Sequence, residues 1–147
     1  MKQLLCTLIV ASTLFARRAA AEYPDVDPAL GCKRNPAIVG DCFRIHGRVQ
    51  VYNGASNVRI WPVGSTRLLG VLPTEQEIVP DNVRRQLSFS KRVYGNFQVC
   101  PFTAERPAHM RFVCVQEAEH LVIEDYTSVS PGARPRITFE PALESVP

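Results

Sequence analysis

The residues with the most suggestive chemistry in this chain are alternating arginines followed by its single tryptophan. Guanidinium groups bind carboxylate, sulfate or phosphate through two parallel hydrogen bonds, and an indole ring beside them can stack on an arginine or on a sugar ring. The candidate residues are Arg44, His46, Arg48, Arg59 and Trp61. They predict a surface that binds an anionic small molecule or a glycan. The simplest alternative is that the arginines only cover the indole, while acidic residues from both ends of the chain neutralise them.

The spacing of two residues within this set is typical of a strand with one buried face. Apolar and polar residues alternate from Phe43 to Val51, and Asn53-Gly54, the strongest short hairpin signal, follows. Val58 to Trp61 then returns as a second strand. Because side chains alternate with period two, we expect both sets of candidate residues on the outer face of this hairpin.

Further strand patterns predict an all-β fold. They cover Arg67–Leu72, Leu87–Phe89, Phe97–Cys100, Met110–Val115 and Leu121–Glu124, with turns at Pro62–Ser65 and Gly95-Asn96 and a helical turn within Pro80–Leu87. Short strands separated by turns are typical of a small antiparallel β-sandwich, such as an immunoglobulin-like one, or of a small barrel. Ile137–Phe139 is a candidate edge strand.

Residues 1–21 have the layout of a secretory signal peptide, with an apolar run followed by small residues that end at Ala21. Cleavage there divides the rest into an extended arm over 22–40, a β domain over 41–126 and a Pro-rich tail over 127–147. We therefore expect an exported protein, periplasmic or extracellular, with no membrane span in the mature chain.

The formal net charge of +3 lies entirely in this leader, on Lys2, Arg17 and Arg18. The remaining chain has no formal net charge, which argues against nucleic acid as a partner. Between Lys33 and Arg111, however, arginines outnumber acidic residues.

Four cysteines follow the leader, and an even number in an exported chain predicts two disulfides. Three pairings are possible. Cys100 and Cys114 belong to two apolar runs joined by a Pro-containing loop, so we expect them on neighbouring strands and bonded to each other. Cys32 then pairs with Cys42. Zinc is not the expected use of these residues, because no Cys-x-x-Cys pair occurs.

The loop between Cys100 and Cys114 is a second candidate site. A loop bracketed by a disulfide can present a recognition segment to a protein partner, as inhibitor loops do, or can be a plain connection. The residues near its middle are Thr103, Glu105, Arg106 and Pro107.

Copper binding is a further alternative, because imidazole and thioether ligands suit that metal. The candidate ligands are His46, His109, Met110 and His120. The sequence has no Gly-x-Ser-x-Gly elbow, no phosphate-cradling glycine loop and no His-Glu-x-x-His motif. We therefore expect a binding module without cofactor and without enzymatic activity.

Several short motifs resemble those of a group of small exported bacterial proteins of uncharacterised function. They are His46-Gly47-Arg48, Tyr52-Asn53-Gly54, Arg59-Ile60-Trp61 and the GSTRLLG stretch at 64–70. The resemblance implies a bacterial, exported domain and brings no activity. A fainter likeness, carried by Gly47, Asn53-Gly54 and Gly95-Asn96-Phe97, is to the prealbumin-like domains appended to secreted carboxypeptidases. It implies a β-sandwich fold only.

Overall fold

The computed structural model describes residues 23–54, 56–74, 77–127 and 132–140, so the predicted leader lies outside the described residues. The elements are the 3-10 helix η1 (Pro28–Leu30), the strands β1 (Phe43–Val51), β2 (Val58–Pro62) and β3 (Leu69–Val71), the short helix α1 (Asp81–Arg84), and the strands β4 (Lys91–Pro101), β5 (Arg111–Asp125) and β6 (Arg136–Phe139). Neither of the described helices is long and apolar enough to cross a membrane.

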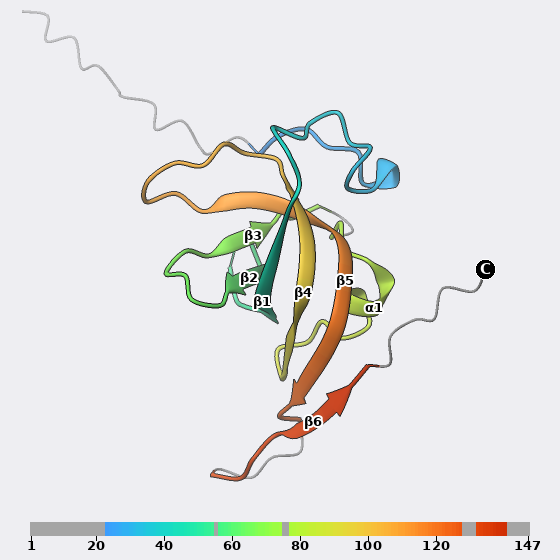
Figure 1. The fold of residues 1–147 in the computed structure, drawn as a ribbon, viewed down its shortest axis with the longest axis vertical. Helices are drawn as coiled ribbons and strands as arrows, with labels where there is room; N and C mark the ends of the chain where they lie inside the picture. Colours follow the sequence, from blue (N-terminus) through green and yellow to red (C-terminus); the bar gives the residue numbers. More distant parts are fainter. Residues whose placement is uncertain (1–22, 55, 75–76, 128–131, 141–147) are drawn as a thin grey trace, which may run out of the picture.

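Five of the strands close into a barrel. β1 pairs antiparallel with β2 and β4, β2 with β3, and β4 with β5. A parallel pairing of β3 with β5 closes the ring, and β6 extends the sheet beyond β5 (Figure 1). This connectivity, with a helix between β3 and β4, is that of the OB-fold, a five-stranded Greek-key barrel. The predicted all-β, disulfide-stapled fold is confirmed. Of the two forms expected from the sequence, a sandwich or a barrel, the closed ring is the barrel.

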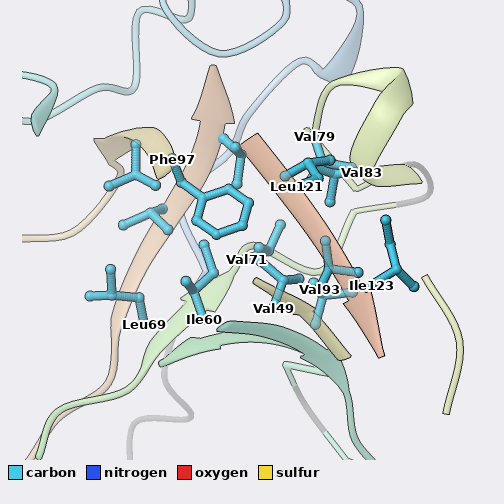
Figure 2. Close-up of a cluster of buried hydrophobic side chains, with 14 residues drawn as sticks. Val49, Ile60, Leu69, Val71, Val79, Val83, Val93, Phe97, Leu121 and Ile123 are labelled. Atoms are coloured by element: carbon cyan, nitrogen blue, oxygen red, sulfur yellow. The ribbon is translucent and has the colours of Figure 1, made fainter. Parts of the chain in front are cut away.

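Apolar side chains at alternate strand positions fill the interior of the barrel. Val49 of β1, Ile60 of β2 and Phe97 of β4 are fully buried and lie in one cluster (Figure 2). Val83 of α1 joins this cluster, so the short helix packs its one buried side chain against the barrel. Complete burial of such side chains stabilises the fold by roughly 1.5–3 kcal/mol each.

The N-terminal half of the barrel follows the sequence expectations closely. β1 and β2 have the predicted bounds to within one residue, and the Asn53-Gly54 hairpin joins them. The turn at 62–65 is closed by a hydrogen bond from the Ser65 N–H to the Pro62 carbonyl. α1 and β6 lie where a helical turn and an edge strand were expected.

Three expectations about the C-terminal half were wrong. Gly95-Asn96 is not a turn but lies in the middle of β4, and glycine is needed there because a Cβ atom at Gly95 would lie 2.6 Å from Leu121 Cδ2 on β5. Leu87–Phe89 is a connection before β4 and not a strand. The two runs within 110–124 belong to a single strand, β5, which contains His120 at a φ of 54°.

The predicted disulfide pairing was also wrong. Cys100 and Cys114 do lie opposite each other on β4 and β5, but the bonds are Cys32–Cys114 and Cys42–Cys100. β4 lies between β1 and β5, so Cys42, directly before β1, and Cys114 of β5 flank Cys100 from two sides. Cys32 in the N-terminal arm then reaches Cys114, which fixes the arm to the barrel.

Candidate functional site

The outer face of the β1–β2 hairpin carries the predicted arginine and tryptophan residues. Arg48 lies opposite Trp61, and Gln50 lies opposite Arg59, in the antiparallel register of these strands. Residues directly opposite each other in a sheet point to the same face. Their neighbours Val49 and Ile60 are buried, so the predicted orientation of the hairpin is confirmed.

Arg48 lies against the only tryptophan of the chain. Its guanidinium carbon is 5.1 Å from the centre of the Trp61 ring. The indole N–H donates a hydrogen bond of 2.8 Å to the carbonyl of Ser65, which holds the ring in place while 44% of the residue stays exposed. Trp61 therefore presents a fixed aromatic surface beside a cation.

Arg59 makes the same kind of contact with a tyrosine. Its guanidinium carbon is 5.1 Å from the centre of the Tyr52 ring, and its Nε donates to the Ser56 carbonyl at 2.9 Å. The Tyr52 hydroxyl accepts a hydrogen bond of 3.4 Å from Arg48 and donates one of 3.3 Å to Gln50. Trp61, Arg48, Tyr52 and Arg59 thus form a continuous set of contacts, which we call the arginine ladder.

The charges of the arginine ladder have no acidic partner among the residues that the structure describes. The ion pairs there involve neither Arg48 nor Arg59. The Nε of Arg48 is buried and has no hydrogen-bond partner in the described part of the chain. Within the described ranges, both guanidinium groups are therefore held by aromatic contacts and by hydrogen bonds to uncharged oxygens, and not by carboxylates.

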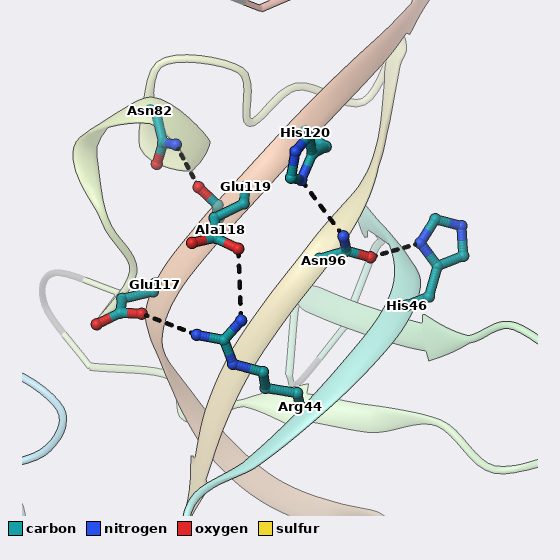
Figure 3. Close-up of polar contacts among 8 residues, drawn as sticks. All are labelled: Arg44, His46, Asn82, Asn96, Glu117, Ala118, Glu119 and His120. Carbon is teal, nitrogen blue, oxygen red and sulfur yellow. Dashed lines mark hydrogen bonds and ion pairs between the residues drawn. The ribbon is translucent and has the colours of Figure 1, made fainter. Parts of the chain in front are cut away.

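Arg44, although on the same face, is neutralised. Its guanidinium group lies 3.7 Å from a carboxylate oxygen of Glu117 and 3.5 Å from one of Glu119 (Figure 3). The site proposed from the sequence is therefore divided, because one arginine of β1 is ion-paired and the next is not. Arg92 on β4 is also paired, with Glu124 at 3.8 Å.

His46 belongs to a separate polar cluster. Its Nδ1 lies 2.9 Å from the side-chain oxygen of Asn96, and the amide nitrogen of Asn96 lies 3.4 Å from Nδ1 of His120 (Figure 3). His109 lies elsewhere, in the loop between β4 and β5. Within the described ranges, the one group of three metal-type ligands consists of Cys32, Cys100 and Cys114, all of them disulfide-bonded.

Tyr126 lies beyond the ladder, where β5 ends. Its hydroxyl accepts a hydrogen bond of 2.7 Å from Arg92 and donates one of 3.0 Å to Glu124, and the Arg92 guanidinium lies over its ring at 4.7 Å. Desolvation and the hydrogen bond to Glu124 raise the pKa of Tyr126 above its usual value of 10.0. This part of the face is therefore internally neutralised.

The second candidate site, the loop between β4 and β5, is exposed and contacts the rest of the protein through ion pairs and a hydrogen bond. Glu105 forms ion pairs with Arg67 and Arg111, and the Thr103 hydroxyl accepts a hydrogen bond from the Phe112 N–H. The disulfide that we expected to join Cys100 to Cys114 across the base of this loop was wrong, because each of these cysteines bonds to a different partner. Arg106 and Pro107 are exposed at its tip.

A groove of about 430 Å³ lies between α1 and β5 and is an alternative candidate for a ligand site. Its charged residues are already paired: Arg85 with Glu140 at 3.3 Å and Glu117 with Arg44. Asp81 pairs with Arg84 at 3.6 Å. The groove therefore offers less unpaired charge than the arginine ladder.

No protein-family model, no curated protein and no solved structure matches this chain. The resemblances drawn from the sequence therefore remain predictions, and the site carries the functional argument.

The residues proposed from the sequence did not include Tyr52 or Gln50, although the alternation places Gln50 on the outer face. A signal was present, because both continue the alternation that places Arg44, His46 and Arg48 on the outer face. The contact between Tyr52 and Arg59 depends on how the hairpin folds over, which the alternation does not specify.

Proposed function

We propose that this protein is an exported binding module, and not an enzyme, which recognises an anionic group on a small molecule or glycan through the arginine ladder. Arg48 and Arg59 would bind a carboxylate, sulfate or phosphate, and the exposed face of Trp61 would stack on an adjoining ring. No cofactor is part of this proposal.

The observation that carries the proposal is the contrast between two kinds of arginine on one face. Arg44 and Arg92 are ion-paired, whereas neither Arg48 nor Arg59 takes part in an ion pair with any described residue. Stacking orients both guanidinium groups without neutralising them. A preoriented cation without a carboxylate is suited to an external anion, because little conformational entropy is lost on binding.

The two disulfides support the export part of the proposal. Disulfides form and persist in oxidising compartments, and small exported domains commonly depend on them. Together with the leader pattern at 1–21, they favour a periplasmic or extracellular location.

The test is ligand binding by the oxidised protein, measured by thermal shift and by calorimetry against sulfate, phosphate and uronic-acid disaccharides at low and moderate salt. The double variant Arg48→Gln and Arg59→Gln should lose roughly 10²-fold or more in affinity, because hydrogen bonds to charged groups contribute about 1.5–3 kcal/mol each. Its own stability should fall by no more than about 1–2 kcal/mol, the sum expected for two exposed cation–π contacts.

The matched control is Arg44→Gln with Arg67→Gln, which removes the same charge from two arginines that are already paired with glutamates. This variant should keep its affinity to within a few-fold. Equal loss of binding in both double variants would mean that only net charge matters, and the proposal would then be abandoned.

The loop between β4 and β5 supports a second candidate, recognition of a protein partner. Arg106 and Pro107 are exposed at the tip of this loop, and Glu105 next to them forms ion pairs with Arg67 and Arg111. Replacing Arg106 and Pro107 by alanine would abolish capture of such a partner and leave anion binding unchanged.

A further inference from the structure

β6 is the last strand of the sheet, and all of its residues are exposed. Among the described strands only β5 pairs with it, so within the described part of the chain its other edge is unpaired (Figure 1). Phe139 is 72% exposed and Ile137 is 55% exposed, and both side chains lie on the same face because they are two residues apart. An exposed edge strand with large apolar side chains is a template for pairing with another chain.

The hydrogen bonds to β5 determine which backbone groups of β6 point toward the open edge. The Glu140 N–H donates to the Leu121 carbonyl at 3.0 Å. Antiparallel neighbours alternate between hydrogen-bonded and non-hydrogen-bonded pairs, so Thr138 also directs its N–H and C=O toward β5. The N–H and C=O groups of Ile137 and Phe139 therefore point the other way.

These outward groups fit a second copy of the same strand. In an antiparallel pair with a two-fold axis at Thr138, Ile137 of each copy lies opposite Phe139 of the other. Both pairs are then of the hydrogen-bonded kind, and together they use every outward N–H and C=O of the two β6 strands. The sequence places prolines at 135 and 141, which have no N–H with which to extend the ladder.

The same register also matches charges. Arg136 would lie opposite Glu140 of the second copy, twice by symmetry, while the large apolar side chains of both copies would meet on the other face. Arg136 takes part in no ion pair with any described residue, although Asp125 of β5 lies opposite it. The charges would therefore alternate across the interface, from Asp125 through Arg136 to Glu140 of the second copy.

We infer that this protein forms a two-fold dimer by antiparallel pairing of β6 with β6 of a second copy. The match of Arg136 with Glu140 and of Ile137 with Phe139 favours β6 itself over an unrelated strand as the partner. Two short strands form a small interface, so the dimer should exchange with the monomer and depend on concentration. The inference does not depend on the arginine ladder, and the dimer carries one ladder on each barrel.

The experiment is analytical ultracentrifugation of the oxidised protein over a wide range of concentration, combined with cross-linking that reports the register. Thr138→Cys should form a disulfide-linked dimer under mild oxidation. Residue 138 would lie opposite its own copy in a non-hydrogen-bonded pair, with Cα atoms about 4.5 Å apart and within reach of a disulfide. Ile137→Cys is the matched control, because this residue is also exposed but would lie opposite Phe139.

Charge variants identify the partner. Arg136→Glu and Glu140→Lys should each weaken self-association about tenfold or more, because each places like charges opposite each other. An equimolar mixture of the two variants should associate again, since acidic then faces basic at both positions. Arg85→Gln is the control for loss of the ion pair between Arg85 and Glu140 within one copy, and it should leave association unchanged.

Three results would overturn this inference. The first is a monomer at every concentration. The second is a dimer that neither charge variant weakens, or that their mixture does not restore. The third is cross-linking of Ile137→Cys as fast as that of Thr138→Cys, because the register would then be wrong. In each case the proposed function of the arginine ladder would still stand.

Discussion

Gly95 lies in the middle of β4 and has no room for a side chain. A Cβ atom there would come within 2.6 Å of Leu121 Cδ2 and 2.9 Å of the Glu119 carbonyl oxygen. The carbonyl belongs to the backbone of β5 and cannot move without disturbing the pairing of β4 with β5. Gly95→Ala should therefore destabilise the protein by about 2 kcal/mol, within the range for overpacked interiors, and lower the Tm by roughly 8 °C.

Urea unfolding of the oxidised protein, followed by the fluorescence of Trp61 and by circular dichroism, measures this change. An unaltered slope of free energy against urea would show that only stability has changed. Gly70→Ala is the control, because its nearest atoms belong to the side chains of Met110 and Phe112, so the loss should be smaller. A neutral or stabilised Gly95→Ala protein would refute the reasoning, since alanine at an unstrained turn position stabilises by about 0.4–1 kcal/mol.

Two further predictions concern the disulfides and the acid side of the stability profile. Non-reducing peptide mapping should find Cys32 joined to Cys114, and a fragment joining Cys32 to Cys42 would contradict the fold. Replacing Cys32 and Cys114 by serine should lower the free energy of unfolding by about 4 kcal/mol, the value that the chain-entropy model gives for a long loop. Hydrogen bonds from the Thr127 side chain and backbone lower the pKa of Asp125 below 3.8, so its contribution to stability is present above that pH and is lost as pH falls through the lower, folded-state pKa. Thr127→Ala should return the pKa of Asp125 toward 3.8 in an NMR titration, and an unchanged pKa would show that this contact is unimportant.

Local pattern was enough to predict the hairpin and the face on which its arginines lie. Alternation in β1 and β2, together with Asn53-Gly54, involves residues close in sequence, and the turn couples them directly. The same reasoning failed at Gly95-Asn96, where glycine is required by the approach of β5 and not by a turn. A distant strand imposes that requirement, so the neighbouring residues do not show it.

The alternation of residues within single strands also did not predict which distant strands pair with each other. The position of β4 between β1 and β5 decides both disulfides and also which arginines find carboxylates. Arg44 is neutralised because Glu117 and Glu119 of β5 reach across β4 to it, whereas no described acidic residue reaches Arg48 in this way. The sequence showed the arginines, but only the fold distinguishes the paired from the unpaired ones.

The nested order of the disulfides has a consequence for how the protein matures. Along the sequence, the Cys42–Cys100 disulfide lies inside the span of the Cys32–Cys114 disulfide. The two N-terminal cysteines therefore cannot form their native bonds until the segment that carries Cys100 and Cys114 is available. In the export that we propose, Cys32 and Cys42 would meet an oxidant first, and the non-native Cys32–Cys42 disulfide would form most quickly because the loop between them is short. Maturation of this protein would then depend on thiol–disulfide exchange, and its yield in an oxidising compartment would follow the activity of a disulfide isomerase and not that of the oxidant.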